Sequence, residues 1–417
     1  MVEQDARHNR PMEIDVRAFD GEPRTFFEAG ALAFSERLRD EDAAAYESTF
    51  EPDRAIAAYD GDRVVATAGI FSFDLTIPGG VVPAAGVTFV GVHPTHRRQG
   101  ILRRMMLRQL ADIHDRGESI AILWASEGSI YQRFGYGLAT TLTRVTVERS
   151  RSAFRMTHVP AGTIRLVDLD EAKRLVPPIH DAIVPTRPGF FNRTTAFWDA
   201  EFFRDPEHWR QGAGEAYYAI HEVAGEPDGY ARYRVRDKWD DNGPQSTVIV
   251  TEKMATTPAG HLDLWRFLLD IDLMAKLEAW NIAPDDPLFL NVLEPRRLGI
   301  ALGDALWLRV VDVASALAQR RYAGDGRLVL EVADELCDWN DGRWSLSVDN
   351  GIPLVEPATE AADLAMDVTD LAAAYLGGFS FVQLADAARV RELQPGALSR
   401  ADALFRTQRP PWCPKVF

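Results

Sequence analysis

Cysteine is scarce in this sequence. The 417 residues contain only Cys337 and Cys413, which are too few for a disulfide framework and are not spaced as a metal-binding motif. We therefore expect two ordinary thiols, with Cys413 the more exposed of the two, and no bound metal.

Long apolar runs are missing as well. No stretch approaches the about 20 apolar residues that a membrane span requires, and the first ten residues are polar, without the hydrophobic core of a signal peptide. Hydrophobic residues make up 46% of the chain and charged residues 26%, as in soluble globular proteins. These features predict a cytoplasmic protein without a membrane partner.

Positive charge is in deficit. The chain has 46 Lys and Arg against 62 Asp and Glu, a net charge of -16. Such a charge repels nucleic acid and anionic lipid, and it attracts polycations such as amino sugars or lysine-rich segments. Taken alone, however, the acidic excess is explained equally well by solubility.

At 417 residues the chain is too long for one ordinary core, which predicts two or three domains. The most informative stretch covers residues 87–117. An apolar segment, Val87–Val92, is typical of a buried strand, and Pro94 ends it because proline cannot donate to a ladder. Apolar residues then recur at helical spacing from Ile101 to Ile113, and Gly117 ends the predicted helix.

The turn between this strand and helix is basic. It reads His96-Arg-Arg-Gln-Gly100, so the free amides of the first helical turn lie beside two guanidinium groups. No Gly-Lys-Ser/Thr follows and no Gly-x-Gly precedes, which argues against a P-loop and against a dinucleotide fingerprint. An arginine pair alone is more often a solvated helix start. The order strand, proline, glycine and helix favours a phosphate site instead.

The turn also carries a family resemblance. Arg97-x-x-Gly100-x-Leu102 resembles motif A of the GNAT acetyltransferases, Gln/Arg-x-x-Gly-x-Gly/Ala, with Leu102 as a departure that suggests a looser or shifted helix start. The longer segments 93–103, 124–128 and 131–137 resemble the enhanced intracellular survival (Eis) acetyltransferases. The overall layout extends this likeness to the whole chain.

The pattern of elements is compatible with that resemblance. Two helices in residues 24–50, a strand meander that includes separate strands at 63–71, 73–77 and 81–83, and a strand-helix-strand unit closed by a strand at 142–147 predict a first GNAT domain. A similar order follows, but no arginine pair precedes Gly260. The last part, beginning with a strand at 308–313, alternates strands with short helices.

We therefore predict a mixed α/β, α+β protein of three domains. Residues 1–153 form an active GNAT domain, residues 154–303 form a degenerate GNAT-like domain, and residues 304–417 form a domain like the sterol carrier proteins, whose C-terminus reaches the active site. The last domain and its reach into the active site are implied by the resemblance.

The predicted acetyl-CoA site lies at the end of the motif strand, on the basic turn and after the next strand. A bulge in the motif strand would leave a backbone N–H near Val90 or Val92 free for the thioester carbonyl. The predicted coenzyme-binding residues are Val90, Gly91, Val92, Arg97, Arg98, Gln99, Gly100, Ile101, Leu102, Arg103, Ser126 and Glu127.

Two catalytic roles come from the resemblance. The first tyrosine of the Tyr131–Gly137 motif is the family's general acid, which assigns that role to Tyr131, although a buried tyrosine is ordinarily a core residue. The family's terminal carboxylate enters the active site, which makes Phe417 the source of the general base; its reference pKa of about 3.3–3.7 keeps it ionised. Without the resemblance, a solvated terminus is the better interpretation.

The same likeness places Phe89 in the wall of the acceptor pocket, together with aromatic residues such as Phe26, Phe27 or Phe34, most of which are explained equally well by core packing. The sequence thus predicts an acetyl-CoA-dependent N-acetyltransferase acting on aminoglycosides or polyamines. The resemblance also implies a homohexamer. Two alternatives stay open: a protein lysine acetyltransferase, and a non-catalytic scaffold that senses CoA or binds lipid.

Overall fold

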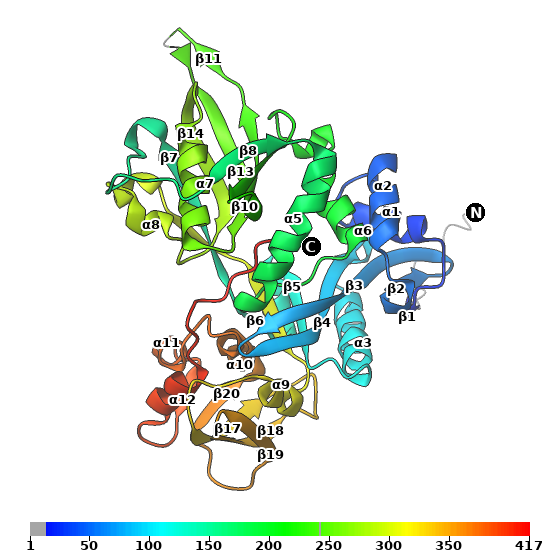
Figure 1. Ribbon diagram of the computed structural model, residues 1–417. Helices are drawn as coiled ribbons and strands as arrows, with labels where there is room; N and C mark the ends of the chain where they lie inside the picture. The colour runs from blue at the N-terminus through cyan, green and yellow to red at the C-terminus, as the bar shows by residue number, and fades with distance from the viewer. Residues whose placement is uncertain (1–13, 242) are drawn as a thin grey trace, which may run out of the picture.

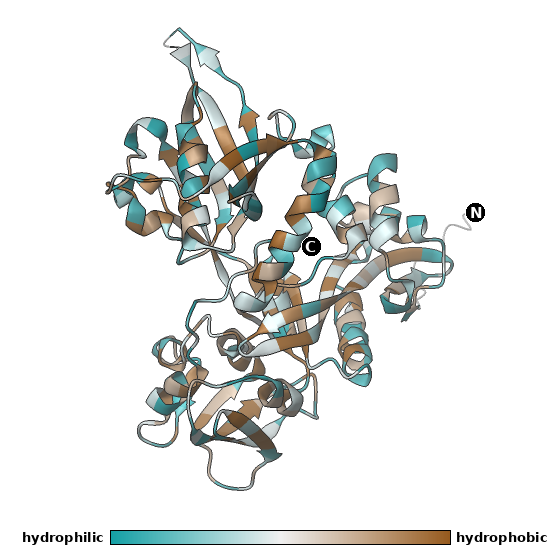
Figure 2. Cartoon of the chain, in the orientation of Figure 1, coloured by the Kyte–Doolittle hydropathy of each residue, from teal (hydrophilic) through white to brown (hydrophobic). Residues whose placement is uncertain are grey.

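The computed structural model describes residues 14–241 and 243–417, so the prediction about the first ten residues lies outside the described residues. Within these ranges the chain forms two seven-stranded sheets, a five-stranded sheet and a two-stranded ribbon. Figure 1 shows them as three units, with the C-terminus near α5 and β5. In Figure 2 the apolar residues concentrate on the strands, and polar residues colour much of the outer helices.

The first unit is built on the sheet of order β1-β2-β3-β4-β5-β16-β6. Its strands are β1 (Ile14–Ala18), β2 (Ile56–Asp60), β3 (Arg63–Ile77), β4 (Gly80–Val92), β5 (Ile120–Trp124), β6 (Tyr136–Leu138) and β16 (Leu306–Val310). Its helices are α1 (Pro23–Ala33), α2 (Asp40–Thr49), α3 (Ile101–Asp115) and the short α4 (Gly128–Tyr131). The predicted apolar stripe of α3 is confirmed, because Met105, Met106 and Ile113 are each 0% exposed.

The strands before the motif differ from the prediction. The segments predicted as separate strands, 63–71 and 73–77, form one strand, β3, and 81–83 joins the motif strand in β4. These two strands pair antiparallel along their length, from Ile77↔Gly80 to Ala66↔Val92. The far end of β3 is supported by the second unit, since the Thr76 amide donates to the Phe190 carbonyl at 2.7 Å. This hydrogen bond joins residues that are far apart in the sequence, so no local sequence pattern could predict it.

Two strands lie in another sheet than predicted. The segment predicted to close the first sheet is β7 (Thr141–Glu148), which lies in the second sheet between β15 and β14. Conversely, β16, predicted to open the last domain, lies in the first sheet between β5 and β6. Alternation identifies a strand but does not identify its neighbours. The domain ranges 1–153, 154–303 and 304–417 therefore stay a prediction. The first sheet includes β16, from beyond residue 303, and the second sheet includes β7, from before residue 154.

The second unit is built on the sheet of order β15-β7-β14-β13-β10-β9-β8. Its other strands are β8 (Thr163–Val167), β9 (Tyr217–Val223), β10 (Glu226–Arg236), β13 (Ser246–Ala255), β14 (Met274–Ile282) and β15 (Ala301–Asp304), with the ribbon β11 (Trp239–Asp240) and β12 (Gly243–Pro244). Its helices are α5 (Leu169–Ile183), α6 (Thr195–Phe197), α7 (Pro258–Asp270) and α8 (Leu288–Asn291).

The third unit has the sheet order β19-β18-β17-β20-β21. Its strands are β17 (Gly326–Ala333), β18 (Gly342–Asp349), β19 (Ile352–Pro357), β20 (Leu364–Asp367) and β21 (Val390–Glu392), and its helices are α9 (Val313–Gln319), α10 (Val368–Tyr375), α11 (Phe381–Asp386) and α12 (Ala397–Phe405). The predicted alternation of strands with short helices is confirmed. No helix in the described ranges is long and apolar enough to cross a membrane.

The chain after α12 runs back over the second unit. Trp412 donates its indole N–H to Asn281 Oδ1 at 2.7 Å, and Asn281 Nδ2 donates to the Cys413 carbonyl at 3.1 Å. Cys413 is consequently 0% exposed, as is Cys337, so the prediction that Cys413 is the more exposed thiol is wrong.

Candidate active site

The site opens where two neighbouring strands separate. β4 and β5 run parallel but pair only at Ala85↔Ala121 and Gly86↔Ile122. Beyond Gly86, β4 continues to Val92 without a partner on the β5 side. An opening between strands in the middle of a sheet exposes backbone groups that a continuous ladder would occupy.

The same part of β4 carries the predicted bulge. Its register with β3 shifts between Thr67 and Gly69, and Phe89 has a φ of +51°. A phenylalanine in this left-handed region is strained and is held there by its surroundings. Here the Thr67 hydroxyl donates to the Phe89 carbonyl oxygen at 2.8 Å. The bulge turns Phe89 and Val90 toward the opening, where both line a cavity.

A cavity of about 810 Å³ lies between the opening and the start of α3. Gly100 precedes the helix with a φ of +77°, and no side chain caps the first turn. The amides of Ile101, Leu102 and Arg103 therefore point out of the helix without a partner in it. The lining includes every predicted coenzyme-binding residue except Gln99, which is exposed and lies outside the cavity wall.

The two arginines of the turn differ in what they bind. The Arg97 guanidinium donates to the Val92 carbonyl at 3.2 Å and to the Ala33 carbonyl at 2.7 Å, so it ties the end of α1 to the end of β4. Arg98, with a φ of +63°, is exposed and makes no hydrogen bond or ion pair with a described residue. Arg98 is therefore the guanidinium of this pair that is free to meet an anion.

The two histidines of the turn make structural contacts. His93 Nε2 lies 3.1 Å from the Ala29 carbonyl oxygen, and burial lowers the pKa of His93. His96 lies between the Thr95 hydroxyl at 2.8 Å and the Asp60 carboxylate at 3.3 Å. Both rings fix the turn. His96 also lines the larger cavity, and neither ring lines the cavity that Phe89 faces.

A second cavity, of about 270 Å³, lies on the other side of the opening. Its aromatic lining consists of Phe27, Phe34, Tyr46, Phe89, Trp124, Tyr131 and Phe417. Of the aromatic residues predicted on the first helices, Phe27 and Phe34 thus face the cavity, whereas Phe26 is fully buried in the core. The charged residues of the lining are Glu36, Asp42 and Arg37.

Asp42 is held from the second unit. Its carboxylate pairs with Arg204 and lies 3.2 Å from His208 Nε2. Next to it, burial and the Asp42 charge raise the pKa of Tyr46 to about 12. Sequence reasoning did not identify Asp42, Tyr46 or Trp124 as cavity residues, because no local pattern distinguishes them from other half-buried side chains.

The two cavities meet at Tyr131. The residues that line both are Phe34, Val90, Ser126 and Tyr131. Tyr131 is 7% exposed, and its hydroxyl makes no hydrogen bond with a described residue. Burial raises the pKa of Tyr131 to about 12, so the phenol keeps its proton at neutral pH. This hydroxyl is a proton donor with no competing partner in the described structure.

The C-terminal residue closes the smaller cavity. The Phe417 ring packs edge-on against Phe73 at 4.9 Å and Phe191 at 5.3 Å between ring centroids. Just before it, Lys415 Nζ donates to the Glu201 carbonyl at 2.8 Å. Phe417 lines the cavity and makes no ion pair with a described residue. The structure thus brings Phe417, Tyr131 and Phe89 together, although they are far apart in sequence.

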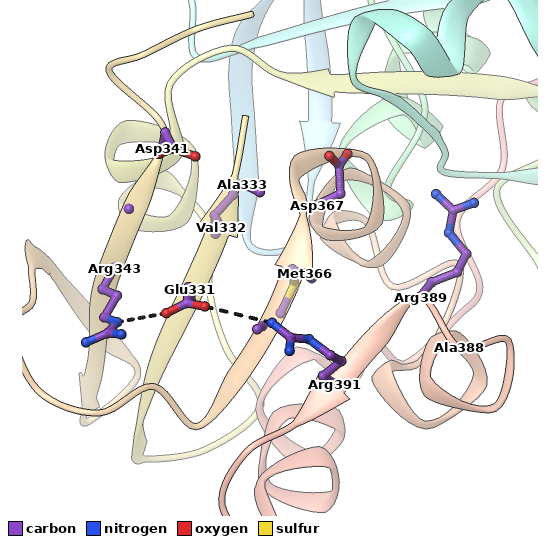
Figure 3. A pocket seen from close by; sticks show the side chains of 12 residues that line it. Glu331, Val332, Ala333, Asp341, Arg343, Met366, Asp367, Ala388, Arg389 and Arg391 are labelled. Atoms are coloured by element: carbon purple, nitrogen blue, oxygen red, sulfur yellow. Dashed lines mark hydrogen bonds and ion pairs between the residues drawn. The ribbon is translucent and has the colours of Figure 1, made fainter. Parts of the chain in front are cut away.

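Another hollow, of about 580 Å³, lies on the third sheet and is shown in Figure 3. Glu331 lies between Arg343 at 2.9 Å and Arg391 at 4.0 Å. Arg389 pairs with Asp370, which lies outside the residues drawn. Because these charges offset one another, the hollow lacks the unpaired charge of an ion site. Within the described ranges, no group of three or more His, Cys, Asp or Glu is arranged to hold a metal.

Comparisons with known proteins agree with this geometry. Residues 17–139 and 189–310 match two families described as acetyltransferase (GNAT) domains, and residues 313–414 match a sterol carrier protein domain. The chain is 43% identical to an uncharacterized N-acetyltransferase of Streptomyces avermitilis, over 90% of this chain and 92% of that protein. It is 36% identical to the N-acetyltransferase Eis of Mycobacterium tuberculosis, over 92% of this chain and 94% of that protein.

A solved structure is similar throughout. Eis1 from Mycobacterium abscessus superposes with a TM-score of 0.85 at 33% identity, over 97% of this chain and all of that one. Two GNAT domains, a sterol carrier domain and a cavity at the motif helix define an N-acetyltransferase of the GNAT superfamily. Within that class the chain belongs to the Eis family of N-acetyltransferases.

Proposed function

We propose that the protein transfers the acetyl group of acetyl-CoA to amines of aminoglycoside or polyamine acceptors. The observation that carries this proposal is that a large cavity at the α3 N-terminus and a smaller aromatic cavity meet at the Tyr131 phenol. The first cavity suits a coenzyme with a diphosphate, and the second suits the amine. Two polar residues, Ser126 and Tyr131, line both cavities, and the Tyr131 phenol keeps its proton at neutral pH.

The coenzyme cavity fits an anion by three separate features. The uncapped amides after Gly100 donate outward, the positive end of the α3 dipole favours negative charge, and Arg98 is unpaired among the described residues. Acetyl-CoA supplies the activated thioester. We expect its diphosphate at this helix start and its acetyl group near Val90 and Ser126, which line both cavities.

The proposed reaction is a direct transfer. The acceptor ammonium gives one proton, through water, to the Phe417 carboxylate, and the neutral nitrogen then forms a bond to the thioester carbonyl carbon. The C–S bond breaks, and the Tyr131 hydroxyl gives its proton to the departing thiolate. The nitrogen, now bonded to the acetyl carbon, loses a second proton, which restores the Tyr131 phenol through water, and the proton held by Phe417 passes to solvent. The products are the acetamide and free coenzyme thiol.

The acceptor class follows from the lining of the smaller cavity. Ammonium groups are attracted to aromatic faces and to carboxylates, and the lining has both, in Phe89, Tyr46 and Glu36, beside one cation, the exposed Arg37. In the proposed mechanism the terminal carboxylate of Phe417 adds a further negative charge. A volume of about 270 Å³ accommodates part of a multi-amine molecule at a time. Presenting different amines in turn would acetylate such an acceptor at several positions.

Calorimetry followed by a thiol-release assay tests the proposal. We expect acetyl-CoA to bind, and thiol release to begin when a multi-amine aminoglycoside is added. Absence of binding would exclude an acetyl-CoA-dependent mechanism. Binding without turnover would favour a CoA-sensing scaffold, and turnover on lysine peptides alone would favour a protein acetyltransferase.

We further propose a cytoplasmic homohexamer, as the family resemblance implies. Light scattering coupled to size-exclusion chromatography tests the assembly, and a monomeric mass would contradict it.

A further inference from the structure

The segment that carries Tyr131 rests on chain that comes much later in the sequence. This segment, residues 128–138, comprises α4, a 3-10 turn and β6. β6 is the edge strand of the first sheet, and its neighbour there is β16, with Leu308↔Gly137 and Arg309↔Tyr136 in register. The path from β6 to the rest of the first sheet therefore runs through β16.

Three glycines allow this close approach. A side chain at Gly128 would place its Cβ 2.7 Å from the Trp307 ring, and one at Gly135 would lie 2.7 Å from the Arg309 guanidinium carbon. At Gly137 a Cβ would collide with the Thr369 carbonyl oxygen of α10. Gly135 also has a φ of +78°, which favours glycine. Each glycine thus faces a part of the chain beyond residue 304.

Arg309 lies at the centre of this contact. Its side chain is 0% exposed, and Nη2 donates to both Asp334 oxygens at 2.8 and 2.6 Å, while Nη1 donates to the Val310 carbonyl at 2.9 Å. Asp334 in turn accepts from Asn340 Nδ2 at 2.9 Å and from the Cys337 amide at 3.2 Å. The guanidinium is therefore fixed from the third unit and has little freedom to rotate.

Burying an ion pair is a poor way to gain stability, because desolvation offsets the attraction. The fixed, planar guanidinium of Arg309 does, however, provide a rigid surface for neighbouring backbone to pack against. Gly135 packs on that plane, and the adjoining Tyr136 ring lies edge-on to the Tyr131 ring, with 6.0 Å between centroids. Tyr131, Tyr136, Trp307 and Cys337 belong to one buried cluster. A continuous line of contacts thus joins Asp334 to the phenol.

We propose that the Arg309–Asp334 pair is a positioning element for catalysis: together with Trp307 it fixes the segment 128–138 so that the Tyr131 hydroxyl points at the junction of the two cavities. The inference rests on the proposed acid role of Tyr131. It gives the third unit a second part in the reaction, since its tail also delivers Phe417. Arg309 acts through Tyr131 and touches neither substrate.

A double-mutant cycle tests this inference. Arg309→Lys keeps the charge but loses the planar fork, and we expect kcat to fall about ten- to hundred-fold, as for a misplaced catalytic group, with acetyl-CoA affinity unchanged. In a Tyr131→Phe background the same change should cost no further activity, because its effect passes through the phenol. A merely structural role would lower kcat equally in both backgrounds, which would overturn the inference.

A matched control separates positioning from general destabilisation. Arg54 is likewise buried in an ion pair, because its Nη1 and Nη2 both donate hydrogen bonds to the Glu118 carboxylate. This pair does not contact segment 128–138. Arg54→Lys should leave kcat unchanged at temperatures where the variant is folded. If it lowers kcat as much as Arg309→Lys, the positioning role is wrong.

A second variant covers the case in which Arg309→Lys does not fold. Gly128→Ala drives a methyl group against the Trp307 ring and displaces the segment from its support, so kcat should fall while acetyl-CoA affinity stays unchanged. Unchanged kcat in Gly128→Ala would contradict the inference. If instead Tyr131→Phe alone keeps wild-type kcat, the proposed acid role has failed, whatever Arg309 does.

Discussion

At the scale of single residues, the proposed reaction depends on a phenol that is buried and makes no hydrogen bond with a described residue. Tyr131 is 7% exposed, and burial raises its pKa to about 12. Most buried tyrosines donate their hydroxyl to a fixed acceptor. A hydroxyl without such an acceptor, at the junction of two cavities, is free to donate to a departing thiolate.

Replacing Tyr131 by phenylalanine should remove the proton donor and little else. We expect kcat to fall by about 10²- to 10⁴-fold, the range for a general acid, with acetyl-CoA affinity nearly unchanged. Steady-state kinetics and calorimetry measure both. Tyr233→Phe is the matched control, since burial raises that pKa to about 12 too, but Tyr233 lies in the second sheet. An equal loss of turnover and affinity would argue against the acid role.

The raised pKa also predicts a pH dependence of stability. An unfolded tyrosine ionises near pH 10, whereas folded Tyr131 keeps its proton to about 12. Between these values the unfolded state binds fewer protons, so the free energy of unfolding falls as the pH rises from about 10 toward 12. Urea denaturation at about pH 8 to 11 should show a smaller fall for Tyr131→Phe than for the wild type. Identical slopes would mean that the phenol is not buried in solution.

At the scale of elements, the turn before α3 divides its two arginines between different tasks. Arg98 faces the coenzyme cavity unpaired with described residues, whereas Arg97 links the Ala33 and Val92 carbonyls. α1 lines the acceptor cavity, so the hydrogen bonds of Arg97 link a wall of that cavity to the end of β4, which lines the coenzyme cavity. We therefore propose that the same dipeptide contributes to coenzyme binding and to the shape of the acceptor cavity.

This division predicts different kinetic effects. Arg98→Ala should raise the KM for acetyl-CoA about ten-fold, the equivalent of one charge-assisted hydrogen bond, and leave the acceptor KM unchanged. Arg97→Ala should raise the acceptor KM more than that for acetyl-CoA, because it releases α1. Initial-rate measurements with each substrate varied in turn check both. The reverse pattern of KM changes would contradict this division of roles between the two arginines.

Much of the first unit could be predicted because its signals are local. The apolar spacing from Ile101 to Ile113, the stop at Pro94 and the C-terminal Gly117 act within one or two turns of chain, and α3 follows them closely. The exchange of β7 and β16 between sheets could not be predicted, since it depends on pairing between strands such as β16 and β5, which are separated by almost two hundred residues.

The candidate site divides in the same way. The predicted coenzyme-binding residues between Val90 and Arg103 line one cavity, because a single strand, turn and helix hold them. Among these predicted residues Gln99 is the exception, since it is exposed and lies outside the lining. Asp42 and Trp124 could be identified as cavity residues only from the structure. The position of Asp42, for example, depends on its ion pair with Arg204 of the second unit.

At the scale of the whole molecule, the second unit holds the tail that ends at the active site. Arg187 Nε donates to the Pro410 carbonyl at 2.9 Å, and the Trp412 amide donates to the Pro188 carbonyl at 3.0 Å. Asn281 then bonds the tail on both sides of its Trp412–Cys413 peptide. A GNAT-like unit without an arginine pair at its own helix start thus has a clear structural task.

Removing a hydrogen bond that holds the C-terminal tail should therefore lower kcat, as deleting the last residue of the tail should. Asn281→Ala should lower kcat several-fold, and deletion of Phe417 should lower it further, while acetyl-CoA affinity stays intact because the coenzyme cavity does not include the tail. Turnover and calorimetric titration of both variants provide the measurement. Asn291→Ala is the matched control, at a half-buried asparagine of α8 whose side chain donates to the nearby Pro287 carbonyl at 2.8 Å. Wild-type turnover after loss of Phe417 would exclude the terminal carboxylate as base.

A crystal structure with bound coenzyme A tests the proposed mechanism most directly. We expect the diphosphate at the amides that follow Gly100 and the sulfur within hydrogen-bond reach of the Tyr131 hydroxyl. Coenzyme bound elsewhere, or a phenol turned away from the sulfur, would contradict the mechanism.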